Sequence, residues 1–260
     1  MDIIEKIGAP FSHRLTSLFN FGYFVSETIA SFFRNVRYGR RLLFRNAAFQ
    51  VLFTAVDAVP IVTLLSIFIF SAIVKQVGTY VPQSGAGLFL GKMFVILIIR
   101  ELAPIIISFV VIARSGTAIA AELSSMMVHE EISSLKVLGI DPLYFIVIPR
   151  VVGITVSILC LSMFFTVLTI VGGMLLANYY FAVPLHQFLE GVLDNMTPLD
   201  VLINILKSVL FGLTISGLCC YYGLSTKYSP TEIPQMTTKA VINSMICCFV
   251  FSAAITLVYY

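Results

Sequence analysis

The sequence predicts an all-α membrane protein with about five transmembrane helices, and three observations support this class. Of the 260 residues, 59% are hydrophobic and only 11% are charged. A soluble domain usually carries about 25% charged residues, because its surface must face water. The mean hydropathy of +1.00 agrees with a lipid-facing chain. The apolar runs are long and continuous, whereas barrel strands would show short alternating segments, so helices are favoured.

The first predicted element is an amphipathic helix within residues 11–45 that lies in the membrane interface. Apolar residues recur at three- and four-residue spacing from Leu15 to Phe33, and a basic cluster follows. Aromatic side chains on one face and arginines at the end are typical of interfacial helices. An ordinary soluble amphipathic helix is the alternative, and it fits less well beside a membrane span. The chain therefore divides into an N-terminal interfacial region, 1–46, and a transmembrane domain, 47–260.

The first span is predicted at about 47–74 and carries Asp57 and Pro60 in its first half. Proline removes a backbone donor and kinks a helix, so this span is expected to be broken or only partly inserted. In that case Asp57 lies at the interface. A proton-relay role for Asp57 is the alternative.

The second span is predicted at about 88–113, with Arg100 and Glu101 in its middle. Burying a charge in a bilayer costs at least about 2.5–3.5 kcal/mol. Adjacent residues do not share one helix face, so each side chain needs a partner on another helix or in a polar cavity. Two interpretations stand equal: the pair lines a cavity for an amphipathic or anionic substrate, or it forms structural ion pairs. Arginine suits phosphate recognition through its planar fork of donors.

Residues 114–142 are much more polar and are predicted to lie outside the hydrocarbon, with one short amphipathic helix. Apolar residues recur every three positions from Ile132 to Leu138, with polar residues between them. Asp141 and Pro142 then supply an N-cap and a proline suited to the first turn of a new helix.

Three further spans complete the transmembrane domain. The membrane portion of the third is expected to begin near residue 151, because Arg150 is charged. Thr197 and Asp200 have capping-box character and open the fourth span. The predicted spans are about 143–177, 201–222 and 240–259, with connections at 178–200 and 223–239.

The distribution of positive charge predicts the orientation. Seven of the sixteen Lys and Arg residues precede the first span, and twelve lie in segments that five spans would place on one side. The connection at 178–200 has none. Lys and Arg gather in cytoplasmic loops, so the N-terminus is predicted inside and the C-terminus outside. A basic cluster beside a hydrophobic stretch fits this rule better than it fits nucleic-acid binding.

The sequence offers no catalytic or nucleotide-binding motif. His129 and the two glutamates after it resemble a zinc-protease helix, but Ser133 replaces the required second histidine. Residues 87–92 suggest a phosphate loop, but Ala86 and Met93 stand where that loop needs a glycine and a hydroxyl. The chain is therefore expected to be a non-catalytic subunit that holds neither metal nor cofactor.

Eight short motifs occur in order along the chain: Arg100-Glu101-Leu102-Ala103-Pro104, Ala113-Arg114-Ser115-Gly116, Ala121-Glu122, Glu130-Glu131-Ile132-Ser133-Ser134-Leu135, Gly139-Ile140-Asp141-Pro142, Pro149-Arg150, Gly172-Gly173, and Lys207-Ser208 to Phe211-Gly212. Together these motifs resemble the MlaE (YrbE-like) permease family of ABC transporters. The resemblance covers roughly residues 40–260.

This resemblance implies a permease that moves phospholipid or a related lipid between the inner membrane and the outer envelope, as in the maintenance of outer-membrane lipid asymmetry. It implies a homodimer, a cytoplasmic ABC ATPase that binds ATP and Mg²⁺, a periplasmic MCE-domain protein and often a STAS-domain subunit. The chain would be a multi-pass protein of the bacterial inner membrane with a periplasmic C-terminus.

The resemblance also implies roles for particular residues. Arg100 and Glu101 match the family's charged pair near the lipid cavity. The helix at 130–138 matches the coupling helix that docks into the ATPase, through Glu130, Glu131, Ile132, Leu135, Lys136 and Leu138. The structural residues of the motifs are Pro104, Arg114, Gly116, Glu122, Asp141, Pro142 and Arg150.

Two rival functions belong to other classes. An ion- or proton-coupled secondary transporter would require Asp57 or Glu101 to titrate during transport, and such transporters often show two related halves, which the sequence lacks. A non-transporting scaffold explains the apolar helices but neither the mid-span charges nor the polar helix.

Overall fold

The computed structural model describes residues 21–28, 30–31, 34, 43–80, 86–227 and 229–259. Among these residues, five helical rods are long and apolar enough to cross a membrane. The rods cover Leu43–Gly78, Gly87–Val128, Leu143–Phe181, Pro198–Leu224 and Pro230–Tyr259. The predicted all-α class with five spans is confirmed. Most of the predicted interfacial segment, 11–45, lies outside the described residues.

The first rod is not interrupted at its proline. A 3-10 turn, η1 (Val56–Ala58), leads directly into α2 (Val59–Tyr80). Helix precedes η1 without a break, so Pro60 lies inside the rod and has no N–H for the carbonyl of Val56 four residues earlier. The N–H of Val59 donates to that carbonyl instead, in the 3-10 turn. The expected break in the first span is therefore reduced to one tightened turn.

The second rod is longer than predicted. It joins five helical segments, of which η2 and η3 are π-helical: α3 (Ala86–Phe94), η2 (Val95–Leu102), α4 (Ala103–Val111), η3 (Ile112–Gly116) and α5 (Thr117–Val128). The helix continues beyond the predicted end of the span near residue 113. The polar residues beyond it do not end the helix, because Ala120 and Leu123 are buried and Arg114 and Glu122 have ion-pair partners on other rods.

The short polar helix is present as α6 (Glu131–Val137), slightly inside the predicted 130–138. Gly139 ends it in the left-handed conformation, with a φ of 75° that favours glycine. The N–H of Ile140 then donates to the carbonyl of Leu135 at 3.0 Å, which satisfies an orphan carbonyl of the helix end.

The third rod begins where the sequence predicts. The N–H of Leu143 donates to Asp141 Oδ1 at 3.0 Å, so this carboxylate caps the start of the helix. A π-helical turn, η4 (Leu143–Val147), follows and leads into α7 (Ile148–Phe181).

The connection after α7 contains a helix that the sequence analysis missed. This helix, α8 (Leu185–Asn195), buries Phe188, Gly191 and Val192 and packs against α3. The two backbones approach closely, because a Cβ added to Gly91 would lie 2.6 Å from the carbonyl carbon of Gly191. Glycine at both positions permits this contact.

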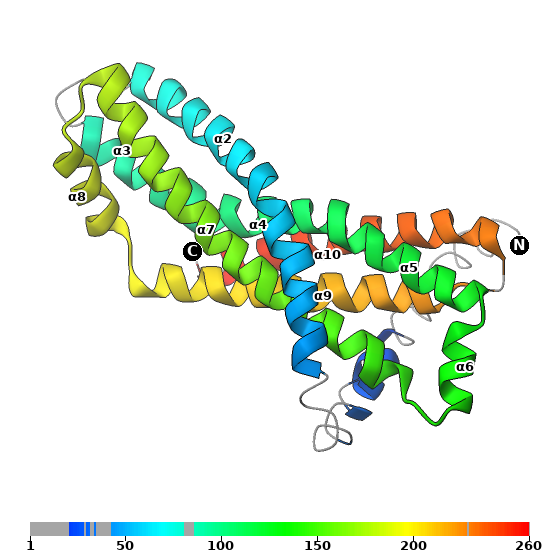
Figure 1. The fold of residues 1–260 in the computed structure, drawn as a ribbon. Coiled ribbons are helices and arrows are strands. Elements are labelled where there is room, and N and C mark those ends of the chain that lie inside the picture. The colour runs from blue at the N-terminus through cyan, green and yellow to red at the C-terminus, as the bar shows by residue number, and fades with distance from the viewer. Residues whose placement is uncertain are drawn as a thin grey trace, which may run out of the picture.

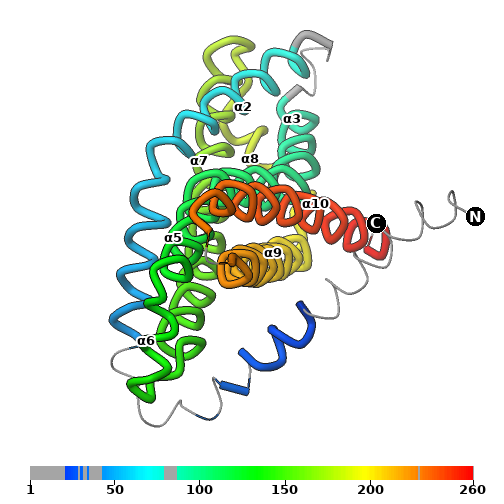
Figure 2. Tube along the Cα trace, turned by 90° about the vertical axis from the view of Figure 1, so that its right-hand side faces the viewer, coloured from blue at the N-terminus to red at the C-terminus, as the bar shows by residue number. Residues whose placement is uncertain are grey.

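The fourth rod, α9 (Pro198–Leu224), is the central element and packs against α5, α7 and α10. Figure 2 shows α9 end-on beneath α5 and α10. The predicted capping box is confirmed, because Thr197 and Asp200 exchange backbone and side-chain hydrogen bonds. The fifth rod consists of a short turn, η5 (Pro230–Glu232), and α10 (Ile233–Tyr259).

The connections separate to the two ends of the rods. Figure 1 shows α6 and the start of α10 at one end and α8 at the opposite end, near the C-terminal end of α10. Ion pairs join the rods near the start of α9, between the first and second rods, and near α6.

Candidate functional site

The first group of charges joins the second rod to the start of α9. Arg100 Nε lies 2.9 Å from Asp200 Oδ1, and Arg100 Nη2 donates to Asp200 Oδ2 at 3.3 Å. The guanidinium fork therefore meets both carboxylate oxygens, an arrangement with more directional specificity than a point contact. The side chain of Asp200 is fully buried, whereas that of Arg100 keeps 22% exposure.

The same Asp200 carboxylate also builds the local structure of α9. Its Oδ2 accepts from the backbone N–H and from the hydroxyl of Thr197, both at 2.9 Å. The backbone N–H of Asp200 donates in return to Thr197 Oγ1 at 3.3 Å. Asp200 thus completes the capping box of α9 and also holds Arg100, so each interaction keeps the carboxylate in place for the other.

The second half of the network surrounds Glu101. Lys207 Nζ lies 3.0 Å from Glu101 Oε1, and the Lys207 side chain is fully buried. Thr256 Oγ1 donates to the same oxygen at 2.6 Å, and Ser252 Oγ donates to Oε2 at 3.3 Å. Glu101 therefore contacts both α9 and α10. The hydroxyls of Thr256 and Ser252 donate to carboxylate lone pairs that Lys207 does not use.

Pro104 explains why the network forms at this point. Proline has no N–H to donate to the carbonyls four and five residues earlier, which belong to Arg100 and Ile99. Lys207 Nζ donates to the carbonyl of Arg100 at 2.9 Å. Asn204 Nδ2 donates to the carbonyl of Ile99 at 2.9 Å. Polar side chains of α9 therefore satisfy backbone groups that the helix itself leaves open, as a membrane interior requires.

The sequence predicts for Arg100 and Glu101 a partner on another helix or a polar cavity, and in the structure each has a separate ion-pair partner on another helix. Their assignment to a substrate cavity is not tested by these contacts and stays a prediction. The sequence analysis missed the two partners, Asp200 and Lys207. A signal was present, because a mid-span charge of each sign calls for opposite charges in other spans, and Lys207 lies within the predicted fourth span.

A second ion pair ties the first rod to the second. Arg114 Nη2 lies 2.7 Å from Asp57 Oδ2, and Arg114 Nη1 donates to the carbonyl of Phe53 at 2.8 Å. The guanidinium carbon also lies 5.1 Å from the centre of the Phe53 ring. Asp57 keeps 53% side-chain exposure, so this carboxylate lies on the protein surface with a fixed cationic partner.

A third ion pair joins α5 to α7. Arg150 Nη2 lies 2.7 Å from Glu122 Oε1. The two partners differ in burial, since the Arg150 side chain is 12% exposed and that of Glu122 is 60% exposed. Arg150 Nη1 is buried and has no hydrogen-bond partner among the described residues. One donor of this arginine is therefore left for another acceptor.

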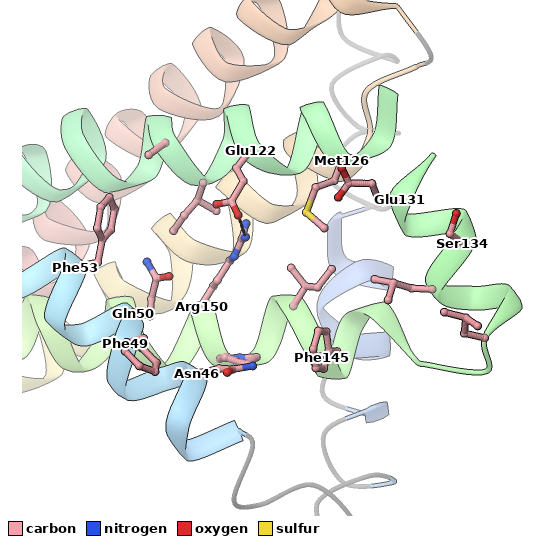
Figure 3. A pocket seen from close by; sticks show the side chains of 16 residues that line it. Asn46, Phe49, Gln50, Phe53, Glu122, Met126, Glu131, Ser134, Phe145 and Arg150 are labelled. Carbon is pink, nitrogen blue, oxygen red and sulfur yellow. Dashed lines mark ion pairs between the residues drawn. The ribbon is translucent and has the colours of Figure 1, made fainter. Parts of the chain in front are cut away.

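This third pair forms part of the wall of an open cavity of about 740 Å³. Figure 3 shows the cavity between the start of the first rod, α5, α6 and the start of the third rod. Aromatic and aliphatic side chains predominate, with a few polar groups between them. The lining residues are Asn46, Phe49, Gln50, Phe53, Ala118, Ile119, Glu122, Met126, Glu131, Ser134, Leu135, Leu138, Phe145, Ile146, Pro149 and Arg150.

The residues assigned to ATPase coupling lie on and around α6. Ile132 is buried, whereas Val137 and Leu138 are 87% and 72% exposed. Glu130 precedes the helix with a φ of 58°, a conformation that non-glycine residues rarely adopt. Glu131, Leu135 and Leu138 also line the cavity, and Lys136 is exposed. Their contact with an ATPase is not tested and stays a prediction.

Asp141 connects the start of the third rod to the N-terminal region. Ser31 Oγ donates to Asp141 Oδ2 at 2.6 Å, and Arg34 Nη2 lies 3.1 Å from the same oxygen. Burial raises the pKa of Asp141, but hydrogen bonds from Ser31, the N–H of Leu143 and Arg34 together outweigh it, and the pKa falls below the ordinary 3.8.

The remaining motif residues shape the helices. A Cβ added to Gly116 would lie 3.1 Å from Cys219 Sγ, so the glycine permits close packing of η3 on α9. Pro142 follows the capping Asp141 at the start of the third rod, where its missing N–H costs nothing.

Comparison with known proteins gives consistent matches. The family model described as Permease MlaE matches residues 47–258. A probable ABC transporter permease protein of Rickettsia felis is 26% identical over 260 residues, which cover 100% of this chain and 98% of the relative. A probable ABC transporter permease protein of Synechocystis is 31% identical over 79% of this chain and 78% of the relative. The chloroplastic protein TRIGALACTOSYLDIACYLGLYCEROL 1 of Arabidopsis thaliana is 28% identical over 81% of this chain and 60% of the relative.

Proposed function

This chain belongs to the MlaE family of ABC transporter permeases, and we propose that it moves phospholipid or a related lipid between the inner membrane and the outer envelope. The family match covers nearly all of the transmembrane domain. The name of the Arabidopsis relative refers to a glycerolipid, which supports a lipid cargo. Maintenance of outer-membrane lipid asymmetry is the role that we propose for such transport.

The observation that carries the proposal is the exposed apolar surface of α6. Val137 and Leu138 are 87% and 72% exposed, although α6 lies outside the five rods. Contact with lipid explains the exposed apolar residues of the rods. It does not explain those of α6, which lies in a polar connection. Val137 and Leu138 are adjacent, and a contiguous apolar patch on such an element is typical of a protein contact surface. An ABC permease requires an ATPase partner, and α6 is the element that we propose for its docking.

The position of α6 offers a route by which the ATPase moves the rods. One end of α6 follows α5 after a two-residue turn, and its other end leads through Asp141 into the third rod. The Glu122–Arg150 pair ties these two rods together beyond α6. A displacement of α6 would therefore move both rods together, and nucleotide would favour one arrangement by its differential binding.

The wider assembly follows from the family and from the charge distribution. We propose a second copy of this chain, a cytoplasmic ATPase that binds ATP and Mg²⁺, a periplasmic MCE-domain protein and a STAS-domain subunit as partners. The N-terminus and α6 lie in the cytoplasm and the C-terminus in the periplasm, because seven of the sixteen Lys and Arg residues precede the predicted first span, whereas the connection at 178–200 has none. Arg100 then contacts the lipid through its remaining exposed surface.

The test introduces a charge on α6. We expect Val137→Asp and Leu138→Asp each to abolish co-purification of the ATPase and ATP-dependent phospholipid transfer between proteoliposomes. Leu193→Asp on α8 is the matched control, because Leu193 is 69% exposed at the opposite end of the rods. This control should retain the ATPase.

Two results would contradict the proposal. One is full ATPase binding by both α6 variants. The other is phospholipid transfer that proceeds equally well without nucleotide, which would favour a secondary transporter.

A further inference from the structure

We propose that the cavity beside α6 binds the headgroup of a zwitterionic aminophospholipid, with the phosphate at Arg150 and the ammonium group at Glu122 and Glu131. This inference rests on the proposed function and on the proposed cytoplasmic position of α6. It adds a headgroup site in the cytoplasmic leaflet that is separate from the Arg100–Asp200 network.

The size and walls of the cavity suit part of a lipid. Its volume of about 740 Å³ lies within the ~300–1,000 Å³ of pockets that bind small ligands. Phe49 and Phe53 form one wall and keep 64% and 50% exposure on the first rod. Because that rod is a membrane span, the same aromatic surface continues from the cavity to the acyl chains of the surrounding bilayer.

Arg150 provides the recognition of phosphate. Its side chain is 88% buried, as the 12% exposure shows, and it projects into the cavity from the start of the third rod in Figure 3. Nη2 is held by Glu122, while the buried Nη1 has no partner among the residues that the structure describes. A buried donor without an acceptor is unfavourable. Nη1 is closed off from solvent as the side chain lies, so the guanidinium has to turn toward the cavity for a phosphate oxygen to accept its charge-assisted hydrogen bond.

The carboxylates determine which kind of phosphate fits. Glu122 and Glu131 both line the cavity, so two negative charges face one positive charge. An inorganic phosphate or an anionic headgroup would be repelled by this surplus of negative charge. A headgroup that carries an ammonium group beside its phosphate complements both signs, with the ammonium donating to the carboxylates. Asn46 and Gln50 lie on the wall next to Phe49 and can donate to the ester carbonyls of the glycerol.

The absence of tryptophan from the chain allows a direct test. Phe145→Trp places a single fluorophore in the cavity wall, and Phe68→Trp places one on the first rod, at a residue that is 63% exposed and does not line the cavity. Each full-length variant is reconstituted in vesicles that contain phosphatidylethanolamine or phosphatidylglycerol with brominated acyl chains, which quench tryptophan on contact.

We expect brominated phosphatidylethanolamine to quench Trp at position 145 with an apparent affinity about fivefold above that of phosphatidylglycerol. Quenching at position 68 should follow the mole fraction of either lipid. Arg150→Gln and Glu122→Gln, each combined with Phe145→Trp, should remove the preference. Glu190→Gln is the matched control, because Glu190 is an exposed carboxylate on α8.

Several results would overturn the inference. Equal quenching by both lipids at position 145 would show no headgroup site, and a preference for phosphatidylglycerol would show an anion site instead. Loss of all lipid contact at position 145 when the ATPase is added would make the cavity part of the ATPase interface. Arg150→Gln combined with Phe68→Trp should be quenched like Phe68→Trp alone, which identifies Arg150→Gln protein that has not misfolded. Glu122→Gln provides a second, milder variant.

Phospholipid transfer measured on the same vesicles separates the two proposals. If ATP-dependent transfer persists while position 145 shows no headgroup preference, only the headgroup site is wrong. If transfer fails in the unmutated complex but the preference is present, the proposed function is wrong and the cavity is a lipid site of another kind.

Discussion

The charge network at the start of α9 and the ion pair in the cavity wall use similar residues in different ways. In the network, Asp200 and Lys207 are fully buried, and several hydrogen bonds surround each of them. In the cavity wall, Glu122 is 60% exposed and Arg150 keeps one buried donor without a partner among the described residues. The first arrangement is saturated at its buried members, Asp200 and Lys207, and the second is open.

The difference teaches how a function can be assigned to charges in a membrane protein. A saturated network stabilises the contact between helices, because loss of any member leaves another charge buried alone. An open pair leaves hydrogen-bonding capacity for a ligand and contributes less to folding. The position of a charged residue in the middle of a span therefore does not by itself identify that residue as a substrate contact. The substitutions below separate the two arrangements, in order of decreasing effect on stability.

Lys207→Met should cause the largest loss of stability. It leaves the Glu101 carboxylate without its cation inside the rods, and breaking a buried pair typically costs about 3–5 kcal/mol. Thermal unfolding in detergent measures the effect. Lys92→Met, at an exposed lysine on α3, is the control and should unfold like the unmodified protein. Glu101→Gln combined with Lys207→Met should recover part of the loss, and an absence of recovery would show that the pair is not coupled.

Thr197→Ala should have an intermediate effect. It removes the hydroxyl that bonds Asp200 but leaves the Arg100–Asp200 contact in place, so we expect a loss of about 1 kcal/mol, as for other N-cap residues. Chemical denaturation measures it. Thr238→Ala removes only an exposed hydroxyl that bonds its own helix and is the matched control. Equal effects of the two substitutions would mean that the cap does not support the network.

Glu122→Gln should change stability by less than about 1 kcal/mol, because Glu122 is 60% exposed and the amide oxygen of glutamine can still accept from Arg150. The same denaturation experiment measures it beside Lys207→Met. A loss as large as that of Lys207→Met would erase the distinction between the saturated and open arrangements.

Asp141→Asn should have the smallest effect of the four substitutions, and this effect should be present at neutral pH and disappear in acid. The pKa of Asp141 lies below the ordinary 3.8, so the native state holds the charged form more strongly than the unfolded state does. This contribution is fully present above the ordinary pKa and is lost as the pH falls through the lower native value. Melting temperatures of the unmodified protein and Asp141→Asn should therefore converge on acidification below about pH 4. A constant difference down to pH 3 would contradict the bonds to Ser31 and Arg34.

Features that depend on neighbouring residues could be predicted from the sequence. The rods follow from continuous apolar runs, and the starts at Asp141 and at Thr197 follow from capping residues three or fewer positions from the groups they bind. The short helix α6 follows from its spacing of apolar residues. In each case the interacting groups are close in the chain, so the local sequence is sufficient.

Features that depend on distant contacts could not be predicted. The extension of the second rod to Val128 and the helix α8 both depend on packing against other helices. A polar segment of sequence does not show whether its charges face water or a partner. The structure shows that Arg114 and Glu122 have such partners in the first and third rods.

The sequence by itself determined the membrane class, the number of rods and the need of Arg100 and Glu101 for partners, because each follows from local composition and from the high free energy of a charge in lipid. Only the tertiary structure decided that the partners are Asp200 and Lys207, about one hundred residues away, and that Arg150 lies in the wall of a cavity. The physical reason is that the free energy of an isolated buried charge indicates that a partner must exist, whereas the packing of the helices determines which residue comes close enough to be that partner.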